Sequence, residues 1–158
     1  MVTELSESGA KVIPVPPPVI YVLAFAVGLA LHAVTDDHIG GRPATAWLGA
    51  ILIAAGLVLA GSAVAMFVRA HTTVIPHRQV SQVVTTGPFR ISRNPMYTAF
   101  ALITVGAALA IGTWWPLATL IPALLVIRFG VIGPEERYLA ATFGEDYAAY
   151  SRRVGRWL

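Results

Sequence analysis

The chain has 158 residues and a formal net charge of +3; 56% of its residues are hydrophobic and only 12% are charged. Soluble domains carry about 25% charged residues, so this composition excludes an ordinary water-soluble protein. It also excludes a nucleic-acid binder, which needs an extended basic face. The absence of cysteine excludes disulfides and thiolate chemistry. The length suits one domain, and we predict a single membrane domain over residues 1–158.

Residues 1–16 form a polar and then proline-rich segment, in which the prolines oppose a regular helix. We predict no signal peptide, because no basic region is followed by a small-residue cleavage site. Residues 17–68 then hold two apolar runs, at 19–34 and 47–68. Both runs are close to the roughly 20 residues that span a bilayer, so we predict two transmembrane helices.

The second run contains Gly49, Gly56 and Gly61 among other small residues. Small residues let helices approach closely in a membrane, where the burial of apolar side chains gives little driving force. These glycines therefore predict close helix packing, and they would also permit a homodimer.

Residues 69–94 form a polar connection that contains four arginines and no acidic residue. The other connection between predicted spans, residues 35–46, has two acids and one arginine. By the positive-inside rule the arginine-rich connection faces the cytoplasm. With four spans, both termini then face the cytoplasm as well.

Residues 95–132 form a predicted helical hairpin, with apolar runs at 95–111 and 114–132 and a tight break at Gly112. Arg128 lies inside the second of these runs. An arginine is costly there unless it reaches the membrane interface or faces a polar cavity, so Arg128 is a candidate functional residue.

Residues 133–158 form a polar tail whose apolar side chains recur at helical spacing. This apolar stripe consists of Leu139, Phe143, Tyr147, Tyr150 and Val154. We predict an amphipathic helix that lies against the membrane face and that Gly144 interrupts. The predicted fold class is therefore an all-α integral membrane protein with about four transmembrane helices and a C-terminal amphipathic helical segment on the cytoplasmic face.

Two polar segments are predicted to meet at that face. In the segment 87–97, Arg93 and Asn94 precede the third span, and a helix N-terminus beside an arginine suits an anion such as a carboxylate. The other segment begins with Glu135 and Glu136, which could bind a cationic or hydroxyl-bearing ligand. Both features also have plain structural explanations: an ordinary helix cap with an inside-positive arginine, and acids that favour a helix N-terminus.

The four histidines predict no metal site, because their spacings fit no short ligand motif. They are His32, His38, His71 and His77. No glycine-rich loop follows a strand, so a soluble dinucleotide-binding fold is not expected either.

Two motifs stand in order on either side of the predicted hairpin. The first is Val-Val-Thr-Thr-Gly-Pro-Phe-Arg at 83–90 followed by Ser-Arg-Asn-Pro-Met-Tyr at 92–97; the second is Glu-Glu-Arg-Tyr-Leu at 135–139, then Phe-Gly-Glu-Asp-Tyr and a final Arg-Trp. Together they resemble the isoprenylcysteine carboxyl methyltransferase family of integral membrane enzymes over residues 69–158. Arg-Asn-Pro is common in the bacterial members, which implies a protein of a bacterial inner membrane.

The resemblance implies S-adenosylmethionine as the methyl donor, bound on the cytosolic side. It implies cofactor contacts from residues that match the family's motifs: Ser81, Gln82, Val83, Val84, Phe89, Asn94, Pro95, Met96, Tyr97 and Glu135 or Glu136. The family's substrate-binding arginine would fall near the apolar Val131, and Arg128, one helical turn earlier, could take its place.

The expected reaction is direct methyl transfer to an oxygen or nitrogen of a lipophilic acceptor that enters from the bilayer between the third and fourth spans. A carboxylate nucleophile needs no base, whereas an amine needs one, and Glu136 is the candidate. Arg93 or Arg128 would orient an anionic head group. Catalysis would consist mostly of positioning and desolvation.

Two other functions are compatible with the pattern. Membrane reductases of the sterol type resemble the same C-terminal half and bind NADPH, although this chain is short and lacks an extra basic cluster for the 2′-phosphate. A membrane scaffold without enzymatic activity would bind no cofactor and would tolerate Tyr97→Ala and Glu135→Ala.

Overall fold

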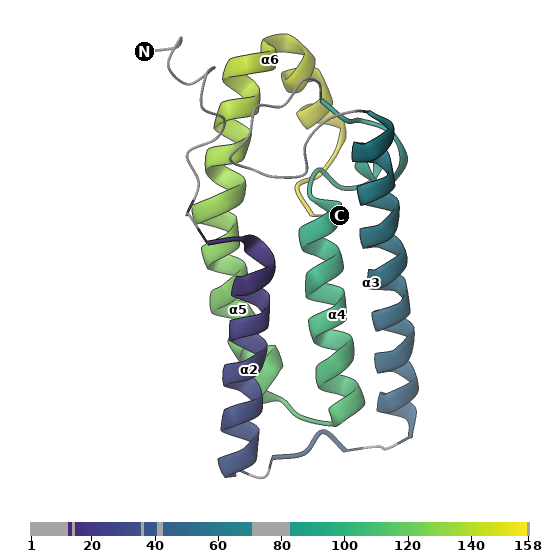
Figure 1. Cartoon of the computed structure of the whole chain (residues 1–158), viewed down its shortest axis with the longest axis vertical. Coiled ribbons are helices and arrows are strands. Elements are labelled where there is room, and N and C mark those ends of the chain that lie inside the picture. Colours follow the sequence, from purple (N-terminus) through teal and green to yellow (C-terminus); the bar gives the residue numbers. More distant parts are fainter. Residues whose placement is uncertain (1–12, 14, 36, 41–42, 71–82, 158) are drawn as a thin grey trace. The chain divides into compact units, whose positions relative to one another are not determined.

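A computed structural model describes residues 13, 15–35, 37–40, 43–70 and 83–157. In this part of the chain the ordered elements are helices, and the only strand-like contact is an isolated bridge between Ser92 and Gly155. The predicted all-helical fold class is confirmed. In chain order the elements are α2 (Pro17–Thr35), α3 (Ala44–Arg69), a 3-10 turn η1 (Gly87–Arg90), α4 (Pro95–Ile111), α5 (Trp115–Ile127), a π-helical turn η2 (Arg128–Ile132) and α6 (Gly133–Arg153) (Figure 1).

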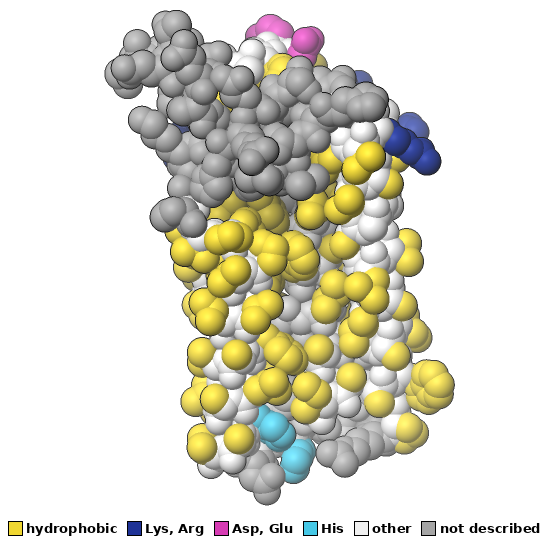
Figure 2. Space-filling model, viewed as in Figure 1, with side chains coloured by type: hydrophobic (Ala, Val, Ile, Leu, Met, Phe, Trp, Pro, Cys, Tyr) yellow, Lys and Arg dark blue, Asp and Glu magenta, His cyan; other side chains and the backbone are white. Residues whose placement is uncertain are grey.

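Three helical stretches are long and apolar enough to cross a membrane: Pro17–Thr35, Ala44–Arg69 and Trp115–Arg153. The apolar helix α4 is shorter, with 17 residues. Large hydrophobic side chains such as Val22 and Val58 are 65% and 73% exposed, and Figure 2 shows hydrophobic side chains along much of the visible helical surface. Water would disfavour such a surface, whereas lipid accommodates it.

The contacts within the chain divide it into two compact units. Unit 1 comprises Met1–Pro14, Gly61–Pro95 and Arg128–Leu158, and unit 2 comprises Val15–Ala60 and Met96–Ile127. Unit 1 thus contains most of both polar motifs, and unit 2 contains most of the apolar helical residues.

Helices in unit 2 approach one another at glycines. A Cβ atom added to Gly106 of α4 would lie 2.6 Å from the backbone oxygen of Gly49 in α3, and one added to Gly56 would lie 2.9 Å from the carbonyl of Ala99. Gly28 of α2 lies against Pro116 of α5 in the same way. The predicted close packing is thus realised inside one chain at Gly49 and Gly56, but not at Gly61, whose added Cβ would meet no described atom within 4 Å. A homodimer through these glycines stays a prediction that the packing does not support.

The loop that connects α2 and α3 is joined to the break between α4 and α5 within unit 2. The Asp37 carboxylate accepts hydrogen bonds from the Thr113 hydroxyl (3.1 Å), the Trp114 backbone N–H (2.8 Å) and His32 Nδ1 (2.9 Å). Burial alone would raise the pKa of Asp37, but these three donors outweigh it and hold that pKa below its ordinary value. The break itself occurs where predicted, at Gly112, which has a positive φ of 86°.

The helix of the fourth span does not end before the paired glutamates. The chain passes from α5 through the π-turn into α6, and Ile132 has helical φ and ψ angles of −61° and −44°. Pro134 lacks the N–H of a regular helical ladder, and a preceding π-turn accommodates such a residue without breaking the helix. Glu135 and Glu136 lie in the first turn of α6, as predicted. The helical stretch is nevertheless continuous from Trp115 to Arg153, so a free helix N-terminus does not explain these two acids.

The tail helix bends at Gly144, as predicted, because that residue leaves helical geometry with φ 51° and ψ −122°. The predicted apolar stripe is also present, but the surface that it covers is protein. Tyr147, Tyr150 and Val154 are buried, and Leu139 and Phe143 pack against them together with Val83 of the first motif. The stripe thus forms the core of unit 1.

Candidate functional site

The first motif is held in place by aromatic side chains of unit 1. The 3-10 turn η1 follows Gly87, whose positive φ of 59° permits the sharp change of direction. Phe89 of this turn is buried and packs edge-on against Phe67 of α3, with ring centroids 5.0 Å apart. The buried Tyr150 hydroxyl donates a 2.7 Å hydrogen bond to the Phe89 carbonyl. The tail helix therefore fixes the backbone of the first motif.

The end of the chain pairs with the residues that precede α4. Val154 leaves the helix with extended angles (φ −120°, ψ 128°), and Gly155 then forms a parallel bridge with Ser92. The Arg93 N–H donates to the Gly155 carbonyl at 2.9 Å, and Asn94 Nδ2 donates to the Arg156 carbonyl at 2.9 Å. Residues 92–94 and 154–156 thus lie side by side.

The two polar motifs meet, as predicted, at the Glu136 carboxylate. Arg156 donates to both of its oxygens, from Nε to Oε1 at 2.8 Å and from Nη2 to Oε2 at 2.7 Å. Arg93 Nη1 lies 3.2 Å from Oε1 and also donates to the Tyr147 hydroxyl at 3.2 Å. The Glu136 side chain is only 17% exposed. The hydrogen bond to Glu136 raises the pKa of the Arg156 guanidinium above its ordinary value.

This arrangement limits the chemistry available to Glu136. An ionised carboxylate offers about four acceptor positions, and three guanidinium contacts already occupy most of them. Little of the group remains to accept a proton from a substrate. In contrast, Arg93 Nε is buried and has no hydrogen-bond partner among the described residues, so it is a donor that an anionic ligand could satisfy.

Arg128 lies beside the first turn of α6 rather than in this ion cluster. Its guanidinium stacks on Phe129, 5.2 Å from the ring centroid. Its Nη1 lies 3.9 Å from the position that a Cβ at Gly133 would occupy. The described part of unit 1 shows no ion pair between Arg128 and Glu136.

The remaining predicted cofactor residues fall into three groups. Ser81 and Gln82 lie outside the described residues. Val83 and Val84 are half-buried and Pro95 is buried in unit 1. Met96 and Tyr97 belong to unit 2, where the Tyr97 carbonyl accepts a 3.0 Å hydrogen bond from the Tyr21 hydroxyl.

Sequence analysis missed the roles of Arg156 and Tyr147 in this cluster. The sequence places Tyr147 in the apolar stripe and in the second motif, and Arg156 at the end of that motif, but it predicts no ion cluster for either residue. Arg156 is separated from Glu136 by 20 positions in the sequence, so no helical spacing relates the two. The only available signal was the presence of the final Arg-Trp in the family motif.

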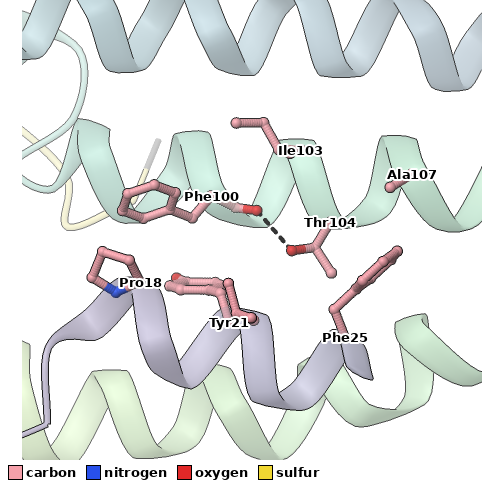
Figure 3. Close-up of a pocket in the computed structure, with 8 residues that line it drawn as sticks. Pro18, Tyr21, Phe25, Phe100, Ile103, Thr104 and Ala107 are labelled. Atoms are coloured by element: carbon pink, nitrogen blue, oxygen red, sulfur yellow. Dashed lines mark hydrogen bonds between the residues drawn. The ribbon is translucent and has the colours of Figure 1, made fainter. Parts of the chain in front are cut away.

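An apolar groove runs between α2 and α4 in unit 2 (Figure 3). Its two polar side chains are already satisfied, because Tyr21 donates to the Tyr97 carbonyl and Thr104 donates to the Phe100 carbonyl at 2.9 Å. The groove therefore presents mainly carbon. It is lined by Pro18, Tyr21, Val22, Phe25, Phe100, Ile103, Thr104 and Ala107.

The chain matches the phospholipid methyltransferase family (PEMT) over residues 44–146. The matched region includes both helices of the predicted hairpin, the first motif and the paired glutamates. It ends before the C-terminal segment that carries Arg156.

Curated relatives carry related names. The chain is 32% identical over 110 residues to protein-S-isoprenylcysteine O-methyltransferase B of Arabidopsis thaliana, an alignment that covers 67% of the chain and 55% of that protein. It is 28% identical over 141 residues to a probable protein-S-isoprenylcysteine O-methyltransferase of Oryza sativa, covering 85% of the chain and 73% of the relative.

An uncharacterized protein of Haemophilus influenzae is 36% identical over 63 residues, which is 40% of the chain and all of that protein. The chain spans only about half the length of the Arabidopsis relative. No solved structure gives a significant match.

Proposed function

Because the chain belongs to the phospholipid methyltransferase family, we propose that it transfers a methyl group from S-adenosylmethionine to a carboxylate oxygen of a lipophilic acceptor in the membrane. The names of its curated relatives, isoprenylcysteine O-methyltransferases, support a carboxylate attached to a hydrophobic chain. The apolar helices of unit 2 support an acceptor drawn from the bilayer.

The state of Glu136 is the single observation that favours a carboxylate over an amine. An amine must lose a proton during methyl transfer, and the base predicted for that step was Glu136. Two guanidiniums engage both oxygens of this side chain. A carboxylate acceptor is ionised at neutral pH and requires no base, so it suits a site in which Glu136 has a structural task.

The residues of unit 1 fit a cofactor that carries both a carboxylate and an ammonium group. Arg93 has a buried Nε without a described partner, and it would bind the carboxylate of S-adenosylmethionine. Glu135, half-buried on the same turn as Glu136, would bind the ammonium group or the ribose hydroxyls. When bound, the cofactor supplies a methyl group already activated by its sulfonium.

The other expected cofactor contacts would enclose the cofactor. In unit 1, the backbone at Asn94 and Pro95 and the side chains of Val83, Val84 and Phe89 would surround the cofactor and exclude water, which strengthens electrostatic contacts in the site. Contacts from Met96 and Tyr97 stay a prediction of the family resemblance. Arg128, beside the first turn of α6, would orient the acceptor's anionic group. The arginine-rich connection before α4 supports a cytoplasmic location of the site.

Binding of S-adenosylmethionine and of NADPH should be measured side by side by calorimetry on the detergent-purified protein. We expect micromolar affinity for S-adenosylmethionine, lost in Tyr97→Ala and Glu135→Ala and retained in Glu145→Ala. Glu145 is a suitable control because its side chain is 94% exposed. Binding of NADPH alone would indicate a reductase, and binding of neither by folded protein would indicate a scaffold.

The acceptor class is tested with radiolabelled S-adenosylmethionine and two probes, an S-farnesylated N-acetylcysteine and S-farnesylcysteamine. The first offers a carboxylate and the second an amine on a similar apolar chain. A methyl ester releases methanol in alkali, whereas an N-methyl group does not. Alkali-labile label on the first probe is expected; alkali-stable label on the second would contradict carboxylate methylation.

A further inference from the structure

Arg156 contacts both polar motifs with different parts of the same residue. Its guanidinium makes two hydrogen bonds to Glu136 of the second motif, at 2.8 and 2.7 Å. Its backbone carbonyl accepts from Asn94 Nδ2 at 2.9 Å and from the Ser92 hydroxyl at 3.4 Å in the first motif. One residue near the end of the chain thus connects the two segments.

Of the two ion pairs that Glu136 makes, the one with Arg156 has the better defined geometry. A two-pronged arginine–carboxylate pair fixes orientation as well as distance, whereas Arg93 approaches Glu136 with a single nitrogen at 3.2 Å. Arg93 in turn depends on Glu136 and Tyr147 for its position. Arg156 therefore holds Glu136, and Glu136 helps to hold Arg93.

Neighbouring arginines of the tail make no comparable contacts. Among the described residues, Arg153 donates only to the Ala149 carbonyl of its own helix, at 3.2 Å. Arg152 approaches Glu145 at 3.9 Å, and both of these side chains are largely exposed. Exposed pairs of this kind contribute little to stability, so Arg152 and Arg153 serve as matched controls for Arg156.

We propose that Arg156 is a positioning residue for cofactor binding, which acts through Glu136 to hold Arg93 and, through its backbone, to hold Asn94. This inference rests on the proposed function, because Arg93 and Asn94 are the residues expected to bind S-adenosylmethionine. Arg156 itself touches neither cofactor nor acceptor in this proposal. The C-terminal segment would therefore contribute to cofactor binding, although the family match ends before it.

The test compares Arg156→Gln, Arg156→Lys and the control Arg153→Gln in the full-length protein. Small displacements of positioning groups can reduce catalytic efficiency by up to about a hundredfold, and we expect about a tenfold rise in the dissociation constant of S-adenosylmethionine for Arg156→Gln. Arg156→Lys keeps the positive charge but loses the two-pronged hydrogen bonding, so its dissociation constant for S-adenosylmethionine should lie between those of the wild type and Arg156→Gln. The KM for the cofactor should rise, whereas the KM for the farnesylated acid should stay within about twofold.

A double variant separates positioning from general stability. If Arg156 acts through Glu136, Glu136→Gln/Arg156→Gln should bind S-adenosylmethionine no more weakly than Glu136→Gln alone. Equal affinities of wild type and Arg156→Gln, or independent losses in the double variant, would overturn the proposal. If the wild type binds no S-adenosylmethionine, the proposed function fails first, and the inference fails with it.

Discussion

Helices in unit 2 touch through glycines, whereas unit 1 is joined by charged and aromatic side chains. In unit 2, Gly49 and Gly106 bring the backbones of α3 and α4 together, and large side chains such as Val58 remain exposed. In unit 1, tyrosine side chains are buried and Glu136 is held by two arginines. The same chain therefore uses two different means of packing.

The difference follows from the polarity of the groups in and around each unit. Lipid is as apolar as a leucine side chain, so helices in a membrane gain little from burying leucine and gain more from close backbone contact. A unit rich in polar groups must instead satisfy each buried donor and acceptor. The residues proposed to bind the cofactor lie mainly in unit 1, where polar groups are gathered.

The largest expected effect comes from adding one methyl group to α3. A Cβ at Gly49 would lie 2.7 Å from the Ala110 backbone nitrogen and would also meet the Gly106 carbonyl. Gly49→Ala should therefore destabilise the protein by about 1–3 kcal/mol through overpacking. Thermal unfolding in detergent, followed by circular dichroism, measures this.

Gly61→Ala is the matched control on the same helix, because no atom of the described residues lies within 4 Å of its added Cβ. Alanine is favoured over glycine in a helix by about 0.5–1 kcal/mol, so this variant should be as stable as the wild type or more so. Equal losses in the two variants would contradict the assignment of close backbone packing to unit 2.

A smaller effect is expected from removing one hydroxyl in unit 1. Tyr150→Phe removes the 2.7 Å hydrogen bond to the Phe89 carbonyl, and such a hydrogen bond contributes about 0.5–1.5 kcal/mol net to stability. The melting temperature should fall. Tyr138→Phe is the control, since that buried tyrosine has no hydrogen bond recorded to the described residues. An equal or larger loss for Tyr138→Phe would contradict a stabilising role of the hydrogen bond from Tyr150 to Phe89.

The smallest effect concerns pH and the Asp37 contact of unit 2. Because the folded-state pKa of Asp37 lies below its ordinary value of 3.8, its stabilising contribution is present above about pH 3.8 and is lost as pH falls through the lower folded value. Asp37→Asn should lose stability at neutral pH and should show a shallower decline in acid than the wild type. Parallel acid-unfolding curves would show that this carboxylate does not link the two loops.

Much of the helical architecture was predictable because its signals are local. The bounds of α4 agree with the apolar run 95–111, since Pro95 begins the helix and Gly112 ends it. The bend at Gly144 was also predictable, because glycine readily adopts a positive φ. The continuous passage from α5 to α6 was not, because a π-turn has no hydrophobic period by which to recognise it.

The amino-acid sequence by itself determined the membrane class, the apolar helices and the motifs that place the chain in its family, because composition, periodicity and motif order are properties of neighbouring residues. Only the tertiary structure decided which glutamate the arginines hold, that Arg156 joins the two motifs, and that the apolar stripe of the tail covers protein. These choices depend on pairs such as Glu136–Arg156 and Ser92–Arg156, which are separated by 20 and 64 positions and whose contacts form only when the chain has folded.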